Sequence, residues 1–316
     1  MGLASLTLVQ DVPLARSTSS HRKAAASKTK SKLVLVSQWR WKTKQSIALR
    51  ASGHDAAELQ HHSIPEYVSV SQTEDEMIYV QLTNTAGWSA QVHLVGCRIA
   101  SWVMPTGDEI LSSTPHLQEP VTGGGGIIPD FPMSSAPGAA SAASSPWQIS
   151  STSADLQPDE RDPEVELVLS SKDRPPIAWP FAFRAVHSIS LHGDQLRSDL
   201  RIYSLEDHAV SFTAMLHSHI EVVDVSTSRV MGLDGGSTTM ALVREPRQGP
   251  MLQLDGTGVD QFFFGTPDYL ELDVGSGAAV ALTSSDWTDT VVRAPSSQAV
   301  TDGKASRTAS WNTVDL

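Results

Sequence analysis

Two histidines separated by one residue are the side chains best suited to chemistry in this chain. His217 and His219 belong to the run Leu216-His-Ser-His-Ile-Glu-Val222. Residues two apart in a strand point to the same face, so both imidazoles should stand side by side. Imidazole titrates near neutral pH and acts as a general acid or base. A His-X-His pair can also bind a metal, but no third ligand lies at motif spacing, and we predict no metal and no cofactor.

A run of glycines, Gly123 to Gly126, precedes the histidine pair and leads into Ile127-Ile-Pro-Asp-Phe-Pro132. Glycine-rich loops can cradle a phosphate through backbone N–H groups. Here neither a Lys-Ser/Thr pair nor a helical pattern follows. A loop that the backbone packs against closely is therefore the favoured interpretation of these glycines.

Short β-rich runs separated by turn residues must position these groups. From about Ile64 onward apolar and polar residues alternate, as in Met77-Ile-Tyr-Val-Gln-Leu82, and no window has a sustained 3.6-residue apolar repeat. This pattern predicts an all-β fold, a large antiparallel β-sandwich. We expect one domain over residues 64–316, preceded by a linker over residues 54–63, with flexible loops at 133–146 and 296–306.

The first 53 residues have a different composition. They hold ten Lys or Arg and one acid, a net charge of +9, which leaves −21 on the remainder of a chain whose total is −12. Rich in Ser, Thr and Ala and without a long apolar core, residues 1–53 are typical of a disordered transit peptide, which favours import into a chloroplast. A disordered basic arm that binds nucleic acid or an acidic partner is the alternative.

Charge, hydropathy and cysteine content exclude several functional classes for the rest of the chain. A strongly acidic surface opposes nucleic-acid binding, whose affinity comes mainly from phosphate neutralisation. No segment has the roughly twenty apolar residues needed to span a bilayer. Cys97 is the single cysteine, which excludes an intrachain disulfide.

Several further motifs follow one another along the chain. They are Val95-Gly-Cys-Arg-Ile-Ala-Ser-Trp102, Gly107-Asp-Glu-Ile-Leu111, the glycine run with Phe131-Pro132, Trp179-Pro-Phe181, Phe212-Thr-Ala-Met-Leu-His217, Val230-Met-Gly-Leu-Asp-Gly235, Gly258-Val-Asp260 and Asp289-Thr-Val-Val-Arg-Ala-Pro295. Each is weak alone, but their order is specific. Together they resemble the hexose-6-phosphate mutarotase (glucose-6-phosphate 1-epimerase) branch of the galactose mutarotase-like superfamily.

The resemblance implies a β-sandwich with a sugar cleft and an enzyme that interconverts sugar anomers. A general acid protonates the ring oxygen while a general base takes the anomeric hydroxyl proton, so both must flank the sugar. His217 matches the family's acid. We expect Asp260, Gly125, Gly126 and His219 to be the candidate substrate-binding residues, and Asp260 holds a position that the resemblance assigns to substrate. Asp260 is either an acceptor for a sugar hydroxyl or a turn residue after Gly256-Thr-Gly258.

The chain departs from the family at the remaining positions. Gly124 stands where the family has an arginine, and residues 139–143 read Ala-Ala-Ser-Ala-Ala where it has a sugar-holding His and Arg. No glutamate follows Glu271, so the base is not identified. Asp302 and Asp315 are candidate substitutes, although a shorter carboxylate would be misplaced by about an ångström.

These departures favour a non-catalytic member of the fold. Together with the leader, they make the chain similar to the mutarotase-like subunits of the chloroplast NADH dehydrogenase-like complex. The expected partners are then protein subunits of a thylakoid complex, in the stroma or on the stromal face. Two alternatives stay open: an active hexose-6-phosphate 1-epimerase, and a module that binds a hexose or hexose phosphate without chemistry.

Overall fold

The structure is a computed structural model of the 316-residue chain. It describes residues 2–13, 33–38, 56–112, 125–131, 141–154, 162–171, 181–207, 211–233, 236–239, 244–245, 250–284, 287, 289–296 and 313–315. Within these residues there is no α-helix, and none of the described segments forms a helix able to cross a membrane. Three short 3-10 helices occur, η1 (Gln60–His62), η2 (Ala142–Ser144) and η3 (Val225–Thr227).

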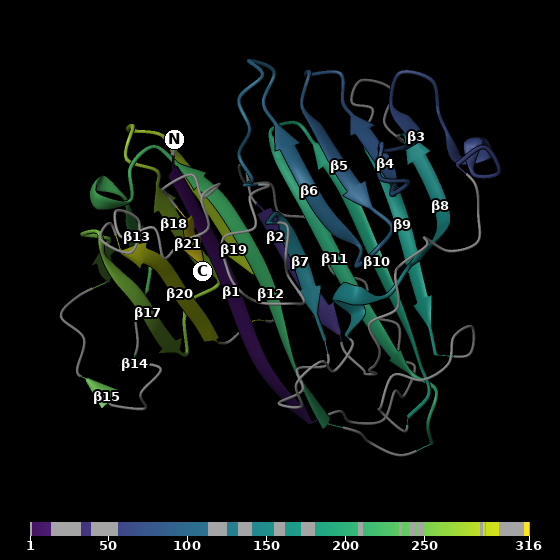
Figure 1. Ribbon diagram of the computed structural model, residues 1–316. Helices are drawn as coiled ribbons and strands as arrows, with labels where there is room; N and C mark the ends of the chain where they lie inside the picture. The colour runs from purple at the N-terminus through teal and green to yellow at the C-terminus, as the bar shows by residue number, and fades with distance from the viewer. Residues whose placement is uncertain are drawn as a thin grey trace, which may run out of the picture.

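The described strands form two twisted sheets (Figure 1). The first runs through β15 (Arg244–Glu245), β14 (Gly236–Thr239), β17 (Thr257–Phe264), β20 (Asp289–Ser296), β1 (Gly2–Pro13), β12 (Ser211–Val222), β7 (Ile127–Asp130), β6 (Arg98–Val103), β5 (Ser89–His93), β4 (Ile78–Thr83) and β3 (Val68–Gln72), and β21 (Thr313–Asp315) pairs with both β12 and β20. The second runs through β16 (Met251–Gln253), β13 (Arg229–Met231), β18 (Tyr269–Asp273), β19 (Ala279–Ser284), β2 (Leu33–Gln38), β11 (Gln195–Ser204), β10 (Phe183–His192), β9 (Pro163–Ser170) and β8 (Gln148–Ala154).

The core lies between the sheets and follows from strand alternation. In β4, Ile78, Val80 and Leu82 are buried while the residues between them are partly exposed, and β9 of the other sheet has the same alternation. At the centre Phe131 packs edge-on against Trp147 and Phe183, with ring centroids 6.3 Å and 6.2 Å apart. Alternating apolar residues on facing strands exclude water from one shared layer. The predicted all-β sandwich is confirmed.

Two strands come from the N-terminal 53 residues. β1 lies between β12 and β20, and β2 pairs in parallel with β11 and β19. Both segments, Ser5-Leu-Thr-Leu-Val9 and Leu33-Val-Leu-Val36, carry the β-branched and apolar residues that favour strands. The interpretation of residues 1–53 as a transit peptide stays a prediction, as does the proposed domain boundary. The short helix η1 lies within the predicted linker.

The end of the predicted 133–146 loop is ordered. Ser141 accepts from the N–H of Ala143, and Ser144 accepts from the N–H of Ser141, which forms a capping box around η2. Ala142 and Ala143 are buried, and a Cβ at Gly96 would lie 2.3 Å from the Ala143 carbonyl. The described alanines of the 139–143 segment, Ala142 and Ala143, are therefore buried in the core.

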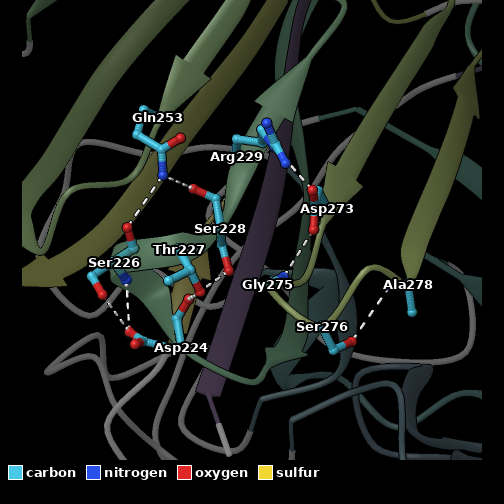
Figure 2. Close-up of polar contacts among 10 residues, drawn as sticks. All are labelled: Asp224, Ser226, Thr227, Ser228, Arg229, Gln253, Asp273, Gly275, Ser276 and Ala278. Carbon is cyan, nitrogen blue, oxygen red and sulfur yellow. Dashed lines mark hydrogen bonds and ion pairs between the residues drawn. The ribbon is translucent and has the colours of Figure 1, made fainter.

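The turn after β12 carries the chain from the first sheet to the second (Figure 2). Asp224 accepts from the backbone N–H of Ser226 at 2.8 Å and starts η3. Arg229 Nε donates to Asp273 at 2.9 Å, and the N–H of Gly275 donates to the same carboxylate at 2.9 Å. The two hydrogen bonds to Asp273 lower the pKa of its carboxyl. These hydrogen bonds hold the turn at Asp224, and the turn fixes the C-terminal end of β12, where the candidate site lies.

Candidate functional site

His217 lies in β12 beside an acidic residue. Its Nε2 is 4.0 Å from Oδ2 of Asp130, which β7 supplies. The register pairs Met215 with Asp130, so the carboxylate stands on the face of the sheet that carries His217. An imidazole and a carboxylate this close can exchange a proton through one intervening group. However, His217 is only 3% exposed, so little of its ring meets solvent in this structure.

His219 is buried on the same face and contacts the glycine run. The two histidine rings are nearly parallel, with centroids 6.5 Å apart. Nδ1 of His219 lies 3.0 Å from the carbonyl oxygen of Gly126. A carbonyl only accepts, so Nδ1 carries the proton and donates. The backbone N–H of His219 donates to the same oxygen at 2.9 Å.

Backbone packing explains the ordered glycines of the run. Gly125 and Gly126 are buried and have positive φ angles of 63° and 84°. A Cβ at Gly126 would lie 2.2 Å from the carbonyl oxygen of Ile99 in β6. Only glycine allows the loop to lie between β6 and β12 at this separation. Gly124 falls outside the described residues.

Glu221 is a residue that the sequence reasoning missed. It follows His219 by two positions, so His217, His219 and Glu221 share one face of β12. Burial raises the pKa of its carboxyl to about 7, and the like charge of Glu109 adds to this effect. A carboxyl that titrates near neutral pH is suited to acid-base chemistry. The alternation of this strand, which the sequence already indicated, could have placed Glu221 on the face of the two histidines. Its raised pKa could not be predicted, because it depends on burial by other strands.

Asp260 belongs to a row that crosses the sheet. The register pairs Asp260 with Arg293, Arg293 with Ser5, and Ser5 with His219. Arg293 Nε donates to Asp260 Oδ1 at 3.2 Å, and Asp260 is exposed. Asp260 lies within β17, so its interpretation as a turn residue is wrong. Because neighbouring strands are about 4.8 Å apart, the backbones at His219 and Arg293 are about 10 Å apart, with one strand between them.

Three buried polar side chains form a second cluster in the core. Cys97 Sγ is 3.0 Å from His187 Nδ1, and His187 Nε2 is 2.6 Å from Ser198 Oγ. Burial lowers the pKa of His187 to about 3 and raises the pKa of the Cys97 thiol well above its usual range. Both groups are therefore neutral and fully enclosed, which opposes a nucleophilic role because thiolate is the reactive form.

The structure brings some of the predicted residues together and leaves others apart. His217, His219, Gly125 and Gly126 adjoin one another around β12, whereas Asp260 lies in β17, with β20 and β1 between it and β12. Of the substitute bases, Asp315 is in β21 and Asp302 falls outside the described residues. Among described residues, no group of three or more His, Cys, Asp or Glu side chains is placed to hold a metal.

Comparison with known proteins identifies the fold. No protein-family model and no curated protein matches the chain. Among solved structures, a proposed mutarotase, YeaD, from Salmonella typhimurium aligns with a TM-score of 0.63 and 16% identity, over 76% of this chain and 81% of that one. The chain has the mutarotase-like fold.

Two further structures agree with this result. A proposed aldose 1-epimerase from Escherichia coli K12 aligns with a TM-score of 0.56 and 13% identity, over 75% of this chain and 86% of that one. A galactose mutarotase-like protein from Clostridium acetobutylicum aligns with a TM-score of 0.51 and 13% identity, over 73% and 81% of the two chains. At these identities the mutarotase-like fold is what the likeness shows, and activity has to be argued from the residues.

Proposed function

We propose that this chain is a non-catalytic, mutarotase-like structural subunit of the chloroplast NADH dehydrogenase-like complex, which takes part in cyclic electron flow around photosystem I. Its partners would be protein subunits of that thylakoid complex. The observation that carries the non-catalytic part is the enclosure of His217, which is 3% exposed and faces Asp130. The basic leader supports the plastid location.

The placement of the acidic groups supports the same proposal. Glu221 is the titrating carboxyl on the face of His217, but it lies four residues along the same strand, about 13 Å away. An acid and a base for ring opening must each come within roughly 3 Å of one sugar. Asp260, the other candidate for sugar contact, is already held by Arg293.

The missing anion contacts point in the same direction. A hexose phosphate needs arginine or lysine forks, or a helix N-terminus. Gly124 replaces the arginine of the resembling family, and the described residues contain no α-helix. We therefore propose that the chain descends from the hexose-6-phosphate branch and no longer carries out its reaction.

Import followed by native gel electrophoresis tests the structural role. The radiolabelled chain is imported into isolated chloroplasts, and solubilised thylakoids are separated on a native gel. We expect the imported chain to migrate with a large thylakoid complex and to be lost from it when an NADH dehydrogenase-like subunit is missing. An imported chain that migrates only as a free monomer in the stroma contradicts the proposal.

One observation favours an active hexose-6-phosphate 1-epimerase as a second candidate. His217 and Asp130 together form a pair able to carry a proton.

A sugar-binding module without chemistry is the third candidate, and the exposed carboxylate of Asp260 is the group best placed to contact a sugar. Calorimetric titration with glucose and glucose 6-phosphate separates this third candidate, because it predicts heat of binding that Asp260→Ala abolishes.

A further inference from the structure

β3 ends the strand order of the first sheet and pairs with β4 on one side. The other edge of such a strand presents backbone N–H and C=O groups with which a further strand can pair. Just before β3, the carbonyl of Tyr67 accepts from the N–H of Thr83 at 2.9 Å, so Tyr67 faces β4. Backbone groups of a strand alternate in direction, and those of Val68, Val70 and Gln72 therefore point away from β4.

The sequence of β3 is suited to pairing with another chain. It reads Val-Ser-Val-Ser-Gln over residues 68–72, with β-branched residues, no charge and no proline. Edge strands are commonly protected by charged residues, prolines or β-bulges. β8, the edge strand of the second sheet, has a bulge between Ile149 and Ser151. β3 pairs with β4 in unbroken register, so its own sequence supplies none of these protections.

The segment just before β3, residues 60–64, covers this edge instead. The N–H of Val70 donates to Ser63 Oγ at 3.1 Å, and Gln60 Nε2 donates to the carbonyl of Val70 at 2.8 Å. The N–H of Ile64 donates to the carbonyl of Val68 at 2.8 Å, and the N–H of Val68 donates to the carbonyl of Ile64 at 2.9 Å. All four outward backbone groups of Val68 and Val70 are thus bonded, as a neighbouring strand would bond them.

Residues 60–64 are also fastened to the second sheet. Thr152 Oγ1 of β8 donates to the carbonyl of His62 at 2.7 Å. The flanking side chains of Leu59 and Ile64 pack against the core. β3 and β8 lie at the same end of the two sheets (Figure 1). Residues 60–64 therefore act as a clasp that closes this end of the sandwich and occupies the edge of β3.

We propose that this clasp, residues 60–64, keeps the edge of β3 from pairing with β3 of a second copy of the chain. Two identical antiparallel strands pair symmetrically. With Val70 opposite Val70 of the second copy, Val68 lies opposite Gln72, and the outward groups form about six backbone hydrogen bonds. The uncharged strand meets no like charge in its own copy. The inference holds whether or not the chain is catalytic or belongs to a thylakoid complex.

Light scattering of the full chain after size exclusion tests the inference. An opened variant, Gln60→Ala with Ser63→Ala and Ile64→Pro, removes three of the four hydrogen bonds to the edge of β3. We expect its mass to reach about twice that of the unmodified chain as protein concentration rises. An opened variant that has the mass of the unmodified chain at every concentration overturns the inference.

A blocked variant identifies the surface that pairs. Gln72→Pro, added to the opened variant, removes an N–H that points away from β4 and leaves the β3–β4 ladder intact. We expect this addition to return the mass to that of the unmodified chain. A dimer that survives Gln72→Pro uses another surface and also overturns the inference.

Hydrogen exchange of a milder variant covers the case in which the opened variant does not fold. Gln60→Ala with Ser63→Ala leaves the Ile64–Val68 pair in place. In dilute solution its Val70 amide should exchange about tenfold faster than in the unmodified chain, and the exchange should slow as protein concentration rises. Exchange of Val70 that does not depend on concentration contradicts pairing at this edge. Protection of β9, in the other sheet, reports that the variant is folded.

Discussion

At the scale of single residues, the candidate site holds groups able to move protons, and their arrangement is the basis of the proposal that the chain does not open sugar rings. His217 matches the acid position of the family that the motifs resemble, yet it is buried and its neighbour is Asp130. Burial brings the pKa of Glu221 to about 7. However, Glu221 lies on the same strand as His217, four residues away, so the two groups do not flank one sugar. Acid-base catalysis depends first on geometry and then on pKa. Here the pKa condition is met and the geometric one is not.

The raised pKa of Glu221 predicts a specific pH dependence of stability. Between its ordinary value of 4.5 and about 7, the folded chain holds a proton on Glu221 that the unfolded chain has lost. The contribution of this group is therefore fully present below pH 4.5 and is lost as the pH rises to about 7. Glu221→Gln, which stays neutral, should gain thermal stability relative to the unmodified chain from pH 5 to pH 8. Thermal unfolding measured across this range checks it, and a difference that does not vary with pH contradicts it.

At the scale of elements, β12 organises the site. Its N–H and C=O groups form hydrogen bonds with the segment before β7. Its C-terminal end is held by the hydrogen-bonded turn at Asp224. The glycine run fits against β12 because Gly126 has no side chain. A strand enclosed on both faces is a rigid scaffold for protein contacts, but it leaves little room for a ligand. This is consistent with a fold retained for assembly.

A pair of glycine variants tests the packing of that loop. Gly126→Ala meets the Ile99 carbonyl at 2.2 Å and has a φ of 84°, whereas Gly107→Ala has a φ of 90° with nothing within 4 Å of the new Cβ. Both variants carry the cost of positive φ, about 1–2 kcal/mol. The clash should raise the loss for Gly126→Ala to about 4 kcal/mol or more. Urea unfolding measures both, and equal losses would show that the loop yields to the added methyl group.

At the scale of the whole molecule, strand periodicity was enough to predict the sandwich. The alternation around Ile78 to Leu82 marks a half-buried strand in any context, and His217 and His219 share a face for the same reason. Pairings between distant segments were out of reach. Nothing local in Ser5 indicates that it pairs with Arg293. The strands in the N-terminal segment were missed because its charge and composition outweighed the short apolar runs.

The enclosed site also could not be predicted from the motifs. The Phe-Thr…Leu-His pattern fixed the position of His217 in the chain, but its exposure depends on side chains packed from other strands. The Asp260–Arg293 contact similarly arises from the register of β17 and β20. Sequence reasoning found the losses at Gly124 and residues 139–143, and the structure adds that the remaining His is covered. The two kinds of observation lead to the same non-catalytic interpretation.

Magnetisation-exchange NMR between the anomers of glucose 6-phosphate tests that interpretation most directly. The spectra are recorded in buffer alone, with the unmodified chain, and with His217→Ala as the matched control. The account predicts the same anomer exchange rate in all three samples. Exchange that the unmodified chain accelerates and that His217→Ala returns to the buffer rate would contradict it and would establish a working hexose-6-phosphate 1-epimerase.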